Sequence, residues 1–287
     1  MIYHARRLAW AVRGGSCAES RVSMPASPGD VLFEELLAQR MGLRLGKFLL
    51  IAAGMVLLGA PVALGQNQRV RDTNANGWYM FFGDHRHSDK WGTHTEFQLR
   101  RFNVITDPQQ AMVRMGGNYY LSDGAMVTLG YAFIETYPYG DFPAADSFPE
   151  QRIYQQLQLQ GKVSSVALTH RYRLEQRWVK FANTPNYSYL NRARYMLRGV
   201  VPFRGNSVDP GEPYLALSDE IFIGFGNNVP NIFDQNRAYA AVGYKINREG
   251  ALEIGYLHQL VQQRNLRVFE HNHTLQIGLT YNFDFRK

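Results

Sequence analysis

Cysteine is almost absent from this sequence. The 287 residues include a single one, Cys17, near the N-terminus. One thiol cannot close an intramolecular disulfide, and it cannot build a metal site from several cysteine ligands. Disulfide-stabilised folds and cysteine-based metal centres are therefore excluded, and we predict that the chain binds no cofactor.

The chain also lacks an apolar run long enough to cross a bilayer as a helix, which takes about 20 residues. The run from Phe48 to Leu64 is shorter, and Pro61 interrupts it. A membrane anchor at this position is therefore disfavoured. A short apolar run that follows a positive segment is instead typical of a secretory signal peptide.

The flanks of this run support the same interpretation. A short positive segment, Met41–Lys47, precedes it, and the small residues at Ala63–Gly65 stand where a signal peptidase cuts. We predict a signal peptide over residues 41–65, cleaved before Gln66. Residues 1–40 show no periodic pattern, and we expect them to be an unstructured extension or the result of a start codon assigned too far upstream.

Continuous basic tracts are missing too, although the chain is basic overall, with 31 Lys+Arg against 24 Asp+Glu. Nucleic-acid-binding proteins gather their positive charge in tracts or along a helix. Here the arginines alternate with other residues along extended segments. We therefore predict that nucleic acid is not a partner.

In many segments the sequence alternates between mainly apolar and mainly polar residues with a period of two. The clearest case is Ser165–Trp178. Successive side chains of a strand point to opposite faces, so this period indicates a β-strand. At about 3.3 Å per residue the strand spans roughly 45 Å, a length typical of a tilted membrane-spanning strand. One face carries Val166, Leu168, His170, Tyr172, Leu174, Gln176 and Trp178, and the other carries Thr169, Arg171, Arg173, Glu175 and Arg177.

Ten further segments repeat the pattern, separated by turn signals such as Ser122-Asp123-Gly124. We therefore predict an all-β fold, an antiparallel transmembrane β-barrel over residues 77–287 that follows a periplasmic lead-in at 66–76. Eleven segments are counted, but single-chain bacterial barrels have an even number of strands, so ten or twelve are expected. The segments are 77–88, 91–103, 111–121, 125–136, 151–161, 165–178, 189–203, 214–226, 236–246, 252–260 and 275–285.

The connections differ in length in a regular way, because long polar loops alternate with short turns. The long loops are 138–149, 180–188, 227–235 and 262–270, and the short turns are 122–124, 162–164 and 247–250. This asymmetry, with a last segment that ends on aromatic residues, is typical of Gram-negative outer-membrane barrels. We expect the protein in the bacterial outer membrane, surrounded by outer-membrane lipid after insertion by the barrel-assembly machinery. A periplasmic lipocalin-like barrel with its arginines outside is the alternative.

Five short motifs follow one another along the second half of the chain. They are RYRLEQR at 171–177, NRARY at 191–195, DEIF at 219–222, FDQNR at 233–237 and GY at 255–256. With these motifs, the region from about Gly77 to the C-terminus resembles the bacterial family catalogued as domain of unknown function 2490, in the outer-membrane β-barrel superfamily. The resemblance implies the barrel fold and the membrane location, and it implies no activity.

On the predicted inner face, arginines outnumber acids. A network of ion pairs would fill a small barrel and hold it rigid, because the arginine fork bonds carboxylates bidentately. The excess of positive charge also indicates a narrow, porin-like passage for small anionic solutes, or a site for an anionic headgroup. The sequence leaves both open. The predicted lumen residues are Glu96, Arg100, Arg114, Arg152, Arg171, Arg173, Glu175, Arg177, Arg192, Arg194, Arg198, Glu220 and Arg237, with Glu253 as a further acid.

The alternative function is an outer-membrane lipid-modifying hydrolase, which needs a Ser or Asp close to a His. His87 and Ser88 are adjacent in sequence and so point to opposite faces of a strand. Ser218 has no histidine on a neighbouring segment. We therefore predict no catalytic residues.

Histidines and aromatic residues offer two further candidate features. His271 and His273 share a strand face and His258 lies on the preceding segment, but beside a long loop they are expected to be solvent-exposed, and we predict no metal site. Amphipathic aromatic rings favour the headgroup level of a bilayer. We predict such interfacial girdles at Trp78, Tyr79, Trp91, Trp178, Tyr281 and Phe283.

Overall fold

The computed structural model describes residues 69–286. The predicted signal peptide at 41–65, the extension at 1–40 and the cleavage position before Gln66 lie outside the described residues. Within residues 69–286 the chain is all-β. No helix in this part of the chain is long and apolar enough to cross a membrane.

Eleven strands form within the described residues, and each is at least 12 residues long. Most strands of globular proteins have about 5–6 residues, so these are long. They are β1 (Val70–Arg86), β2 (Trp91–Phe102), β3 (Asp107–Ser122), β4 (Ala125–Thr136), β5 (Phe148–Val163), β6 (Val166–Val179), β7 (Ser188–Pro202), β8 (Pro213–Phe225), β9 (Phe233–Lys245), β10 (Gly250–Gln262) and β11 (Val268–Tyr281).

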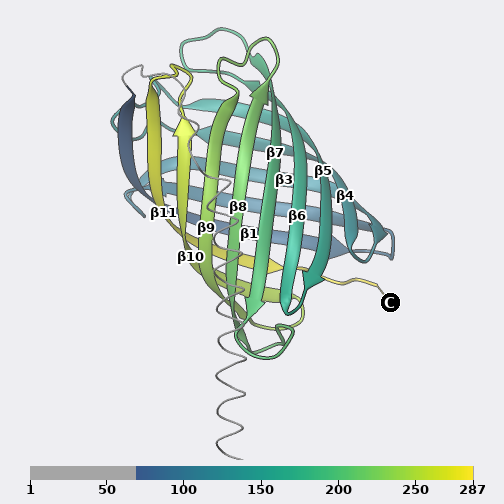
Figure 1. Ribbon diagram of the computed structural model, residues 1–287. Coiled ribbons are helices and arrows are strands. Elements are labelled where there is room, and N and C mark those ends of the chain that lie inside the picture. The colour runs from purple at the N-terminus through teal and green to yellow at the C-terminus, as the bar shows by residue number, and fades with distance from the viewer. Residues whose placement is uncertain (1–68, 287) are drawn as a thin grey trace, which may run out of the picture. The chain divides into compact units, whose positions relative to one another are not determined.

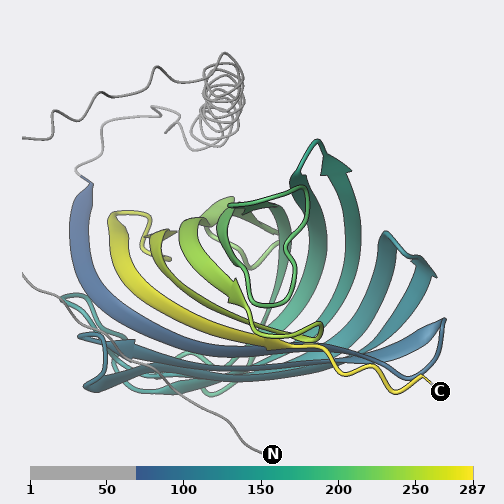
Figure 2. The ribbon, with the colours of Figure 1, turned by 90° about the horizontal axis from the view of Figure 1, so that it is seen from below.

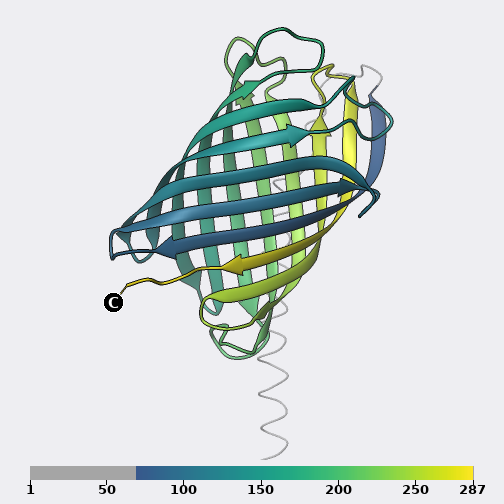
Figure 3. The same ribbon diagram turned by 180° about the vertical axis from the view of Figure 1, so that it is seen from behind.

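The strands close into one barrel, in which each strand pairs antiparallel with its sequence neighbour (Figures 1 and 3). The closing pair is different: β1 and β11 run parallel, in register from Val70 opposite Val268 to Phe82 opposite Thr280. Strands that alternate in direction must close with a parallel pair whenever their number is odd. The count of eleven is therefore confirmed, and the expected even number is wrong.

Most strands begin earlier than predicted, and the difference is largest at β1 and β11. β1 starts at Val70, inside the segment 66–76 that we expected to precede the barrel. In the first residues of β1 the buried side chains are the polar Asp72, Asn74 and Asn76, and the residues between them form no apolar outer face. Apolar and polar residues therefore do not alternate there, and the sequence gave no signal for a strand. β11 starts at Val268 and ends at Tyr281, whereas the last segment was predicted over 275–285.

Side chains alternate between the interior and the outer face along each strand, as the period of two predicts. On β6, Arg171, Arg173 and Arg177 point inward, while Tyr172 and Leu174 are exposed outside. Figure 2 shows the strands curving around the interior that these residues share. Large apolar side chains exposed on the strands include Phe97, Leu99, Val113, Met115, Leu129, Tyr131, Phe133, Ile153, Leu159, Val242, Ile254, Tyr256, Leu275 and Leu279.

One side of the interior is apolar. A buried cluster consists of Trp78, Tyr214, Ala216, Tyr239, Ala241 and Leu257, from β1, β8, β9 and β10. Val208, from the connection between β7 and β8, packs against this cluster. Trp78 is only 1% exposed, so its predicted place in an outer girdle is wrong: its even position in β1 faces the interior together with Met80 and Phe82.

Tyr154 of β5 fills another part of the interior and is 1% exposed. Its ring lies over Gly130 of β4, where an added Cβ would approach the ring atoms to about 2.4 Å. Gly116 of β3 is similarly close to the Tyr154 hydroxyl. The small inward-facing residues of β3 and β4 therefore make room for a bulky tyrosine that narrows the barrel.

The C-terminal residues pack against the end of β1, the strand that pairs with β11. The Phe283 ring lies 5.2 Å from His85, and the Phe285 ring stacks on His87 at 5.4 Å. The backbone N–H of Arg86 donates to the Phe283 carbonyl at 2.8 Å, and the N–H of Phe285 donates to the Arg86 carbonyl at 2.8 Å. The terminal aromatic residues thus lie past the end of β11 and continue the pairing beside β1.

Connections at the two ends of the barrel differ in length. One end carries 103–106, 137–147, 180–187, 226–232 and 263–267, and the other carries 87–90, 123–124, 164–165, 203–212 and 246–249. The predicted asymmetry is present with two exceptions: the connection 203–212 is long among the short turns, and the connection 103–106 is short among the long loops. The residue before β1 and the C-terminal residues lie at opposite ends, because the barrel has an odd number of strands.

Candidate functional site

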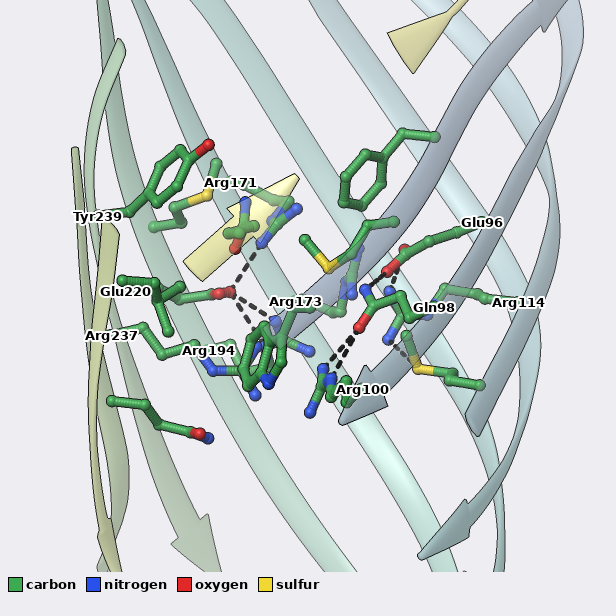
Figure 4. A pocket seen from close by; sticks show the side chains of 18 of the residues that line it. Glu96, Gln98, Arg100, Arg114, Arg171, Arg173, Arg194, Glu220, Arg237 and Tyr239 are labelled. Carbon is green, nitrogen blue, oxygen red and sulfur yellow. Dashed lines mark hydrogen bonds and ion pairs between the residues drawn. The ribbon is translucent and has the colours of Figure 1, made fainter. Parts of the chain in front are cut away.

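A cavity of about 550 Å³ lies inside the barrel. Its lining runs from Phe148, the first residue of β5, to Gln160 near the end of the same strand. Ten arginines and six carboxylates line it (Figure 4 shows part of this lining). The carboxylates are Asp84, Glu96, Glu150, Glu220, Asp234 and Glu253.

Glu175 of β6 is the most connected acid of the interior and is 0% exposed. It accepts from Arg192 Nη2 and from Arg194 Nη1, each at 2.7 Å. The guanidinium groups of Arg152 and Arg114 lie 3.8 and 4.0 Å from its carboxylate. One buried carboxylate therefore balances positive charge contributed by three strands, β3, β5 and β7.

Two further glutamates each bind a pair of arginines. Glu220 of β8 accepts from Arg171 Nη2 at 2.9 Å and from Arg194 Nη2 at 2.8 Å. Glu150 of β5 accepts from the Nη2 atoms of Arg152 at 2.9 Å and Arg177 at 3.0 Å. Glu150 uses both of its oxygens for the two guanidinium groups, whereas Glu220 accepts from both arginines through Oε1. A carboxylate oxygen has two lone pairs, so one carboxylate can hold two guanidinium groups at once in either way.

The two remaining glutamates that line the cavity each form an ion pair with a single arginine. Glu96 bonds Arg114, and Glu253 bonds Arg198. Glu253 also accepts from the Tyr214 hydroxyl at 2.8 Å. These contacts leave seven of the ten arginines ion-paired to carboxylates of the described residues.

The other three, Arg100, Arg173 and Arg237, form no ion pair within residues 69–286, and we call them the carboxylate-free arginines. Each is held by a glutamine carbonyl. Arg100 donates from Nη2 to Gln98 at 2.6 Å, and Arg173 donates from Nη2 to Gln156 at 2.6 Å. Arg237 donates from Nη2 to its neighbour two residues earlier, Gln235, at 3.2 Å.

Inward-facing aromatic rings support the arginines from the side. The guanidinium carbons of Arg100 and Arg237 lie 3.8 and 4.9 Å from the centroid of the Trp78 ring. Arg237 and Arg194 share the Phe222 ring at 4.7 and 4.2 Å. A cation over an aromatic face is attracted by the ring quadrupole, so these rings stabilise guanidinium groups without neutralising them.

Tyr139, in the connection 137–147, also lines the cavity. Its hydroxyl donates to Glu270 at 2.7 Å. Burial and the neighbouring Glu270 carboxylate raise the pKa of Tyr139 well above its ordinary value. The phenol therefore remains a neutral donor at physiological pH, and it ties this loop to the barrel wall at β11.

The structure brings the predicted lumen residues together. Twelve of the thirteen line the cavity, and Glu175 is buried beside them. Sequence reasoning missed Glu150, Asp234 and Asp84. Glu150 and Asp234 fell outside the predicted strands, because β5 and β9 each begin three residues earlier than predicted. Glu150 has the same parity as Arg152, and Asp234 bonds Arg192 at 2.6 Å, so the interior is less positive than ten arginines against four glutamates implied.

No described serine hydroxyl bonds a histidine. The hydroxyl of Ser88 accepts from the backbone N–H of Trp91, and Ser218 lies opposite Arg198 and Tyr239. His94 is buried in the cavity between two carboxylates, with Nδ1 2.8 Å from Asp84 and Nε2 3.4 Å from Glu96. A general base needs one ring nitrogen free for its nucleophile, and both nitrogens of His94 face carboxylates.

The three histidines considered as metal ligands lie on the outer face. The His258 ring is 5.5 Å from His271 and 5.4 Å from His273. The Tyr256 hydroxyl lies 2.6 Å from His273 Nδ1, which occupies that nitrogen. Across residues 69–286 no three His, Cys, Asp or Glu side chains are grouped as metal ligands.

Together these features define a closed, eleven-stranded β-barrel with a charged interior. The chain belongs to the family described as "Protein of unknown function (DUF2490)", whose model matches residues 75–272. The resemblance to this family is therefore confirmed. The chain is similar to an uncharacterized protein of Methylorubrum extorquens, 26% identical over 186 residues, which cover 64% of this chain and 77% of the relative. No solved structure matches it.

Proposed function

We propose that the protein is an outer-membrane β-barrel whose lumen is a narrow passage that prefers small anions. The observation that carries the proposal is the charged cavity inside a barrel with an apolar exterior. In this proposal, the barrel-assembly machinery inserts the chain, and outer-membrane lipid surrounds it.

The distribution of polarity supports the membrane location. Large apolar side chains such as Leu129 and Met115 are exposed on the strands, while charged residues such as Glu175 and Arg173 are buried inside. A soluble lipocalin-like barrel needs the opposite distribution, a polar exterior around an apolar ligand cavity. Exposed apolar surface of this extent favours contact with lipid.

The lining of the cavity supports a passage. It includes residues near both ends of β5, so the cavity follows the strand for most of its length. Tyr154 and the apolar cluster around Trp78 occupy part of the cross-section, so the bore is narrow. The carboxylate-free arginines leave net positive charge along it, and a positive lining favours anions.

Planar-bilayer recording of the purified, refolded protein tests this proposal. We expect small steady conductance steps, with reversal potentials in a KCl gradient that indicate anion preference. Replacing Arg100, Arg173 and Arg237 with glutamine removes the unpaired charge, so the chloride-to-potassium permeability ratio is expected to fall toward one.

A matched control removes three positive charges that lie outside the cavity lining, in the R204Q/R248Q/R267Q variant. This control is expected to keep the anion preference. Absence of conductance from a refolded barrel that still shows heat-modifiable migration on gels would contradict the passage, and the charged interior would then have only a structural role.

The odd strand number predicts an unusual topology for an inserted barrel. With Cys17 replaced by serine, cysteine substitutions at Arg69 and Ala145 are expected to react with a membrane-impermeant maleimide on intact cells. Cysteine at Asp123 or Arg286 is expected to react only after the outer membrane is permeabilised. The reason is that β1 starts at the long-loop end, whereas the chain leaves β11 at the short-turn end.

Labelling of Arg69→Cys and Arg286→Cys from the same side would contradict the eleven-stranded barrel. The Ala145 and Asp123 positions serve as internal controls, because they belong to opposite ends irrespective of how β1 and β11 pair.

A further inference from the structure

The carboxylate-free arginines differ from the other cavity arginines in how they are held. Seven arginines bind carboxylates, which neutralise them. Arg100, Arg173 and Arg237 instead bind glutamine carbonyls, which are neutral acceptors. A glutamine partner fixes the direction of the guanidinium group and leaves its full positive charge available to a ligand.

Two of the glutamines occupy corresponding places, and the third lies on a neighbouring strand. Gln98 and Gln235 each precede their arginine by two residues on the same strand, so both side chains of each pair face inward. Gln156 lies directly opposite Arg173 across the β5–β6 pair. All three glutamines line the same cavity as the arginines they hold.

Two of these three arginines, Arg173 and Arg237, also have a buried N–H group without an acceptor among the described residues. Arg173 is 3% exposed, and its Nη1 is buried without a hydrogen-bond partner among the described residues. The Nε of Arg237 is also buried and unpartnered within residues 69–286. Buried donors normally have acceptors, because leaving one unsatisfied costs about 1–3 kcal/mol.

Shared contacts bring these groups into one region of the cavity. Arg100 and Arg237 lie over the same Trp78 ring. Arg237 and Arg194 lie over the same Phe222 ring, and Arg194 is directly opposite Arg173 across β6 and β7. Figure 4 shows Arg100, Arg173 and Arg194 in the space between the Glu96 and Glu220 carboxylates.

We propose that Arg100, Arg173 and Arg237 form a binding site for the phosphate group of a small soluble molecule, with Trp78 as its apolar wall. The inference deepens the proposed anion passage and rests on it. A phosphate offers several acceptor oxygens and two negative charges, which match converging guanidinium forks better than a single chloride does. The adjoining faces of Trp78, Tyr214 and Tyr239 give the organic part of the solute an apolar surface.

Trp78 can report binding directly, since it contacts two of the three arginines. Substituting phenylalanine for Trp10, Trp91 and Trp178 leaves Trp78 as the single tryptophan of the chain. In detergent micelles at constant ionic strength, we expect inorganic phosphate to change its fluorescence saturably, and chloride at the same concentrations to leave it unchanged. The R100Q/R237Q variant is expected to bind phosphate at least about tenfold more weakly, because charge-assisted hydrogen bonds are lost.

Two control variants separate a built site from a diffuse positive field. R177Q removes one positive charge from the same cavity, while Glu150 keeps Arg152 as its partner; it is expected to bind phosphate as tightly as the parent. R100K/R237K keeps both charges without the planar fork and is expected to bind several-fold more weakly. Equal weakening by R177Q and R100Q/R237Q, or unchanged binding in R100Q/R237Q, would overturn the site.

Lipid headgroups are the other source of phosphate. Vesicles containing phosphatidic acid present the same group at a membrane surface, and we expect Trp78 not to respond to them. A response to these vesicles alone, without one to inorganic phosphate, would overturn the assignment to a soluble molecule.

The fluorescence experiment does not depend on conduction. Saturable phosphate binding without conductance would leave the site in place and remove the passage. Anion-selective conductance without saturable binding would leave the passage in place and remove the site.

Discussion

Replacing Glu175 with glutamine is expected to lower the free energy of unfolding of the barrel by about 3–5 kcal/mol, because removing one partner of a buried ion pair leaves the remaining charge uncompensated. Glu175 is fully buried and bonds Arg192 and Arg194 at 2.7 Å. Without it, arginines from three strands repel one another in a space from which water is largely excluded. The midpoint of urea unfolding in micelles, with tryptophan fluorescence as the readout, measures the change.

Two further variants make this prediction specific. Glu253→Gln removes a carboxylate that is more exposed and has one arginine partner, Arg198, so its effect is expected to be less than half as large. The E175Q/R194Q double variant removes an arginine together with its acid and leaves Glu220 with Arg171. The loss of unfolding free energy in this double variant is expected to be smaller than the sum of the losses in E175Q and R194Q by about 1–3 kcal/mol. An E175Q protein within about 0.5 kcal/mol of the parent would show that Glu175 does not organise the interior.

Replacing Leu129 with arginine is expected to reduce the stability of the barrel in lipid vesicles by about 2–4 kcal/mol. Leu129 is on the outer face of β4 and 62% exposed. If lipid covers that face, the substitution places a charge in hydrocarbon. If water covers it, the same substitution changes an exposed surface residue and costs at most about 0.5 kcal/mol.

Leu121 provides a matched control, because it is an outward leucine that is 50% exposed and lies at the end of β3 beside the turn 123–124. The Leu121→Arg side chain can reach the headgroup region, so a cost of about 0–1 kcal/mol is expected. Equal, small effects of the Leu121→Arg and Leu129→Arg variants on folding into vesicles would contradict the transmembrane placement.

The arrangement of strands could be read from the sequence to a large extent. Alternation located eleven segments and assigned the correct inward parity to Arg173 and Glu175, because a strand has only two faces and one of them was consistently apolar. It failed where neither face is apolar, as in the first residues of β1, where Asp72 and Asn74 face inward. There, pairing with β11 defines the strand.

Strand parity also placed the candidate site residues, but not their partners. Arg198 and Glu253 are 55 positions apart, and Tyr139 and Glu270 are 131 apart. Such pairs form across the lumen, so they depend on the diameter of the barrel and on the stagger of its strands. The expectation that Trp78 belongs to an outer girdle failed because aromatic residues suit both the interface and a packed interior.

The sequence by itself determined the all-β class, the segments that form strands and the charge of the inner face, since these follow from local alternation. Only the tertiary structure decided that eleven strands close through a parallel β1–β11 pair. It also decided which arginines remain without a carboxylate, because that depends on which side chains meet across the closed lumen. No local pattern carries that information: it requires the register of all eleven strands together.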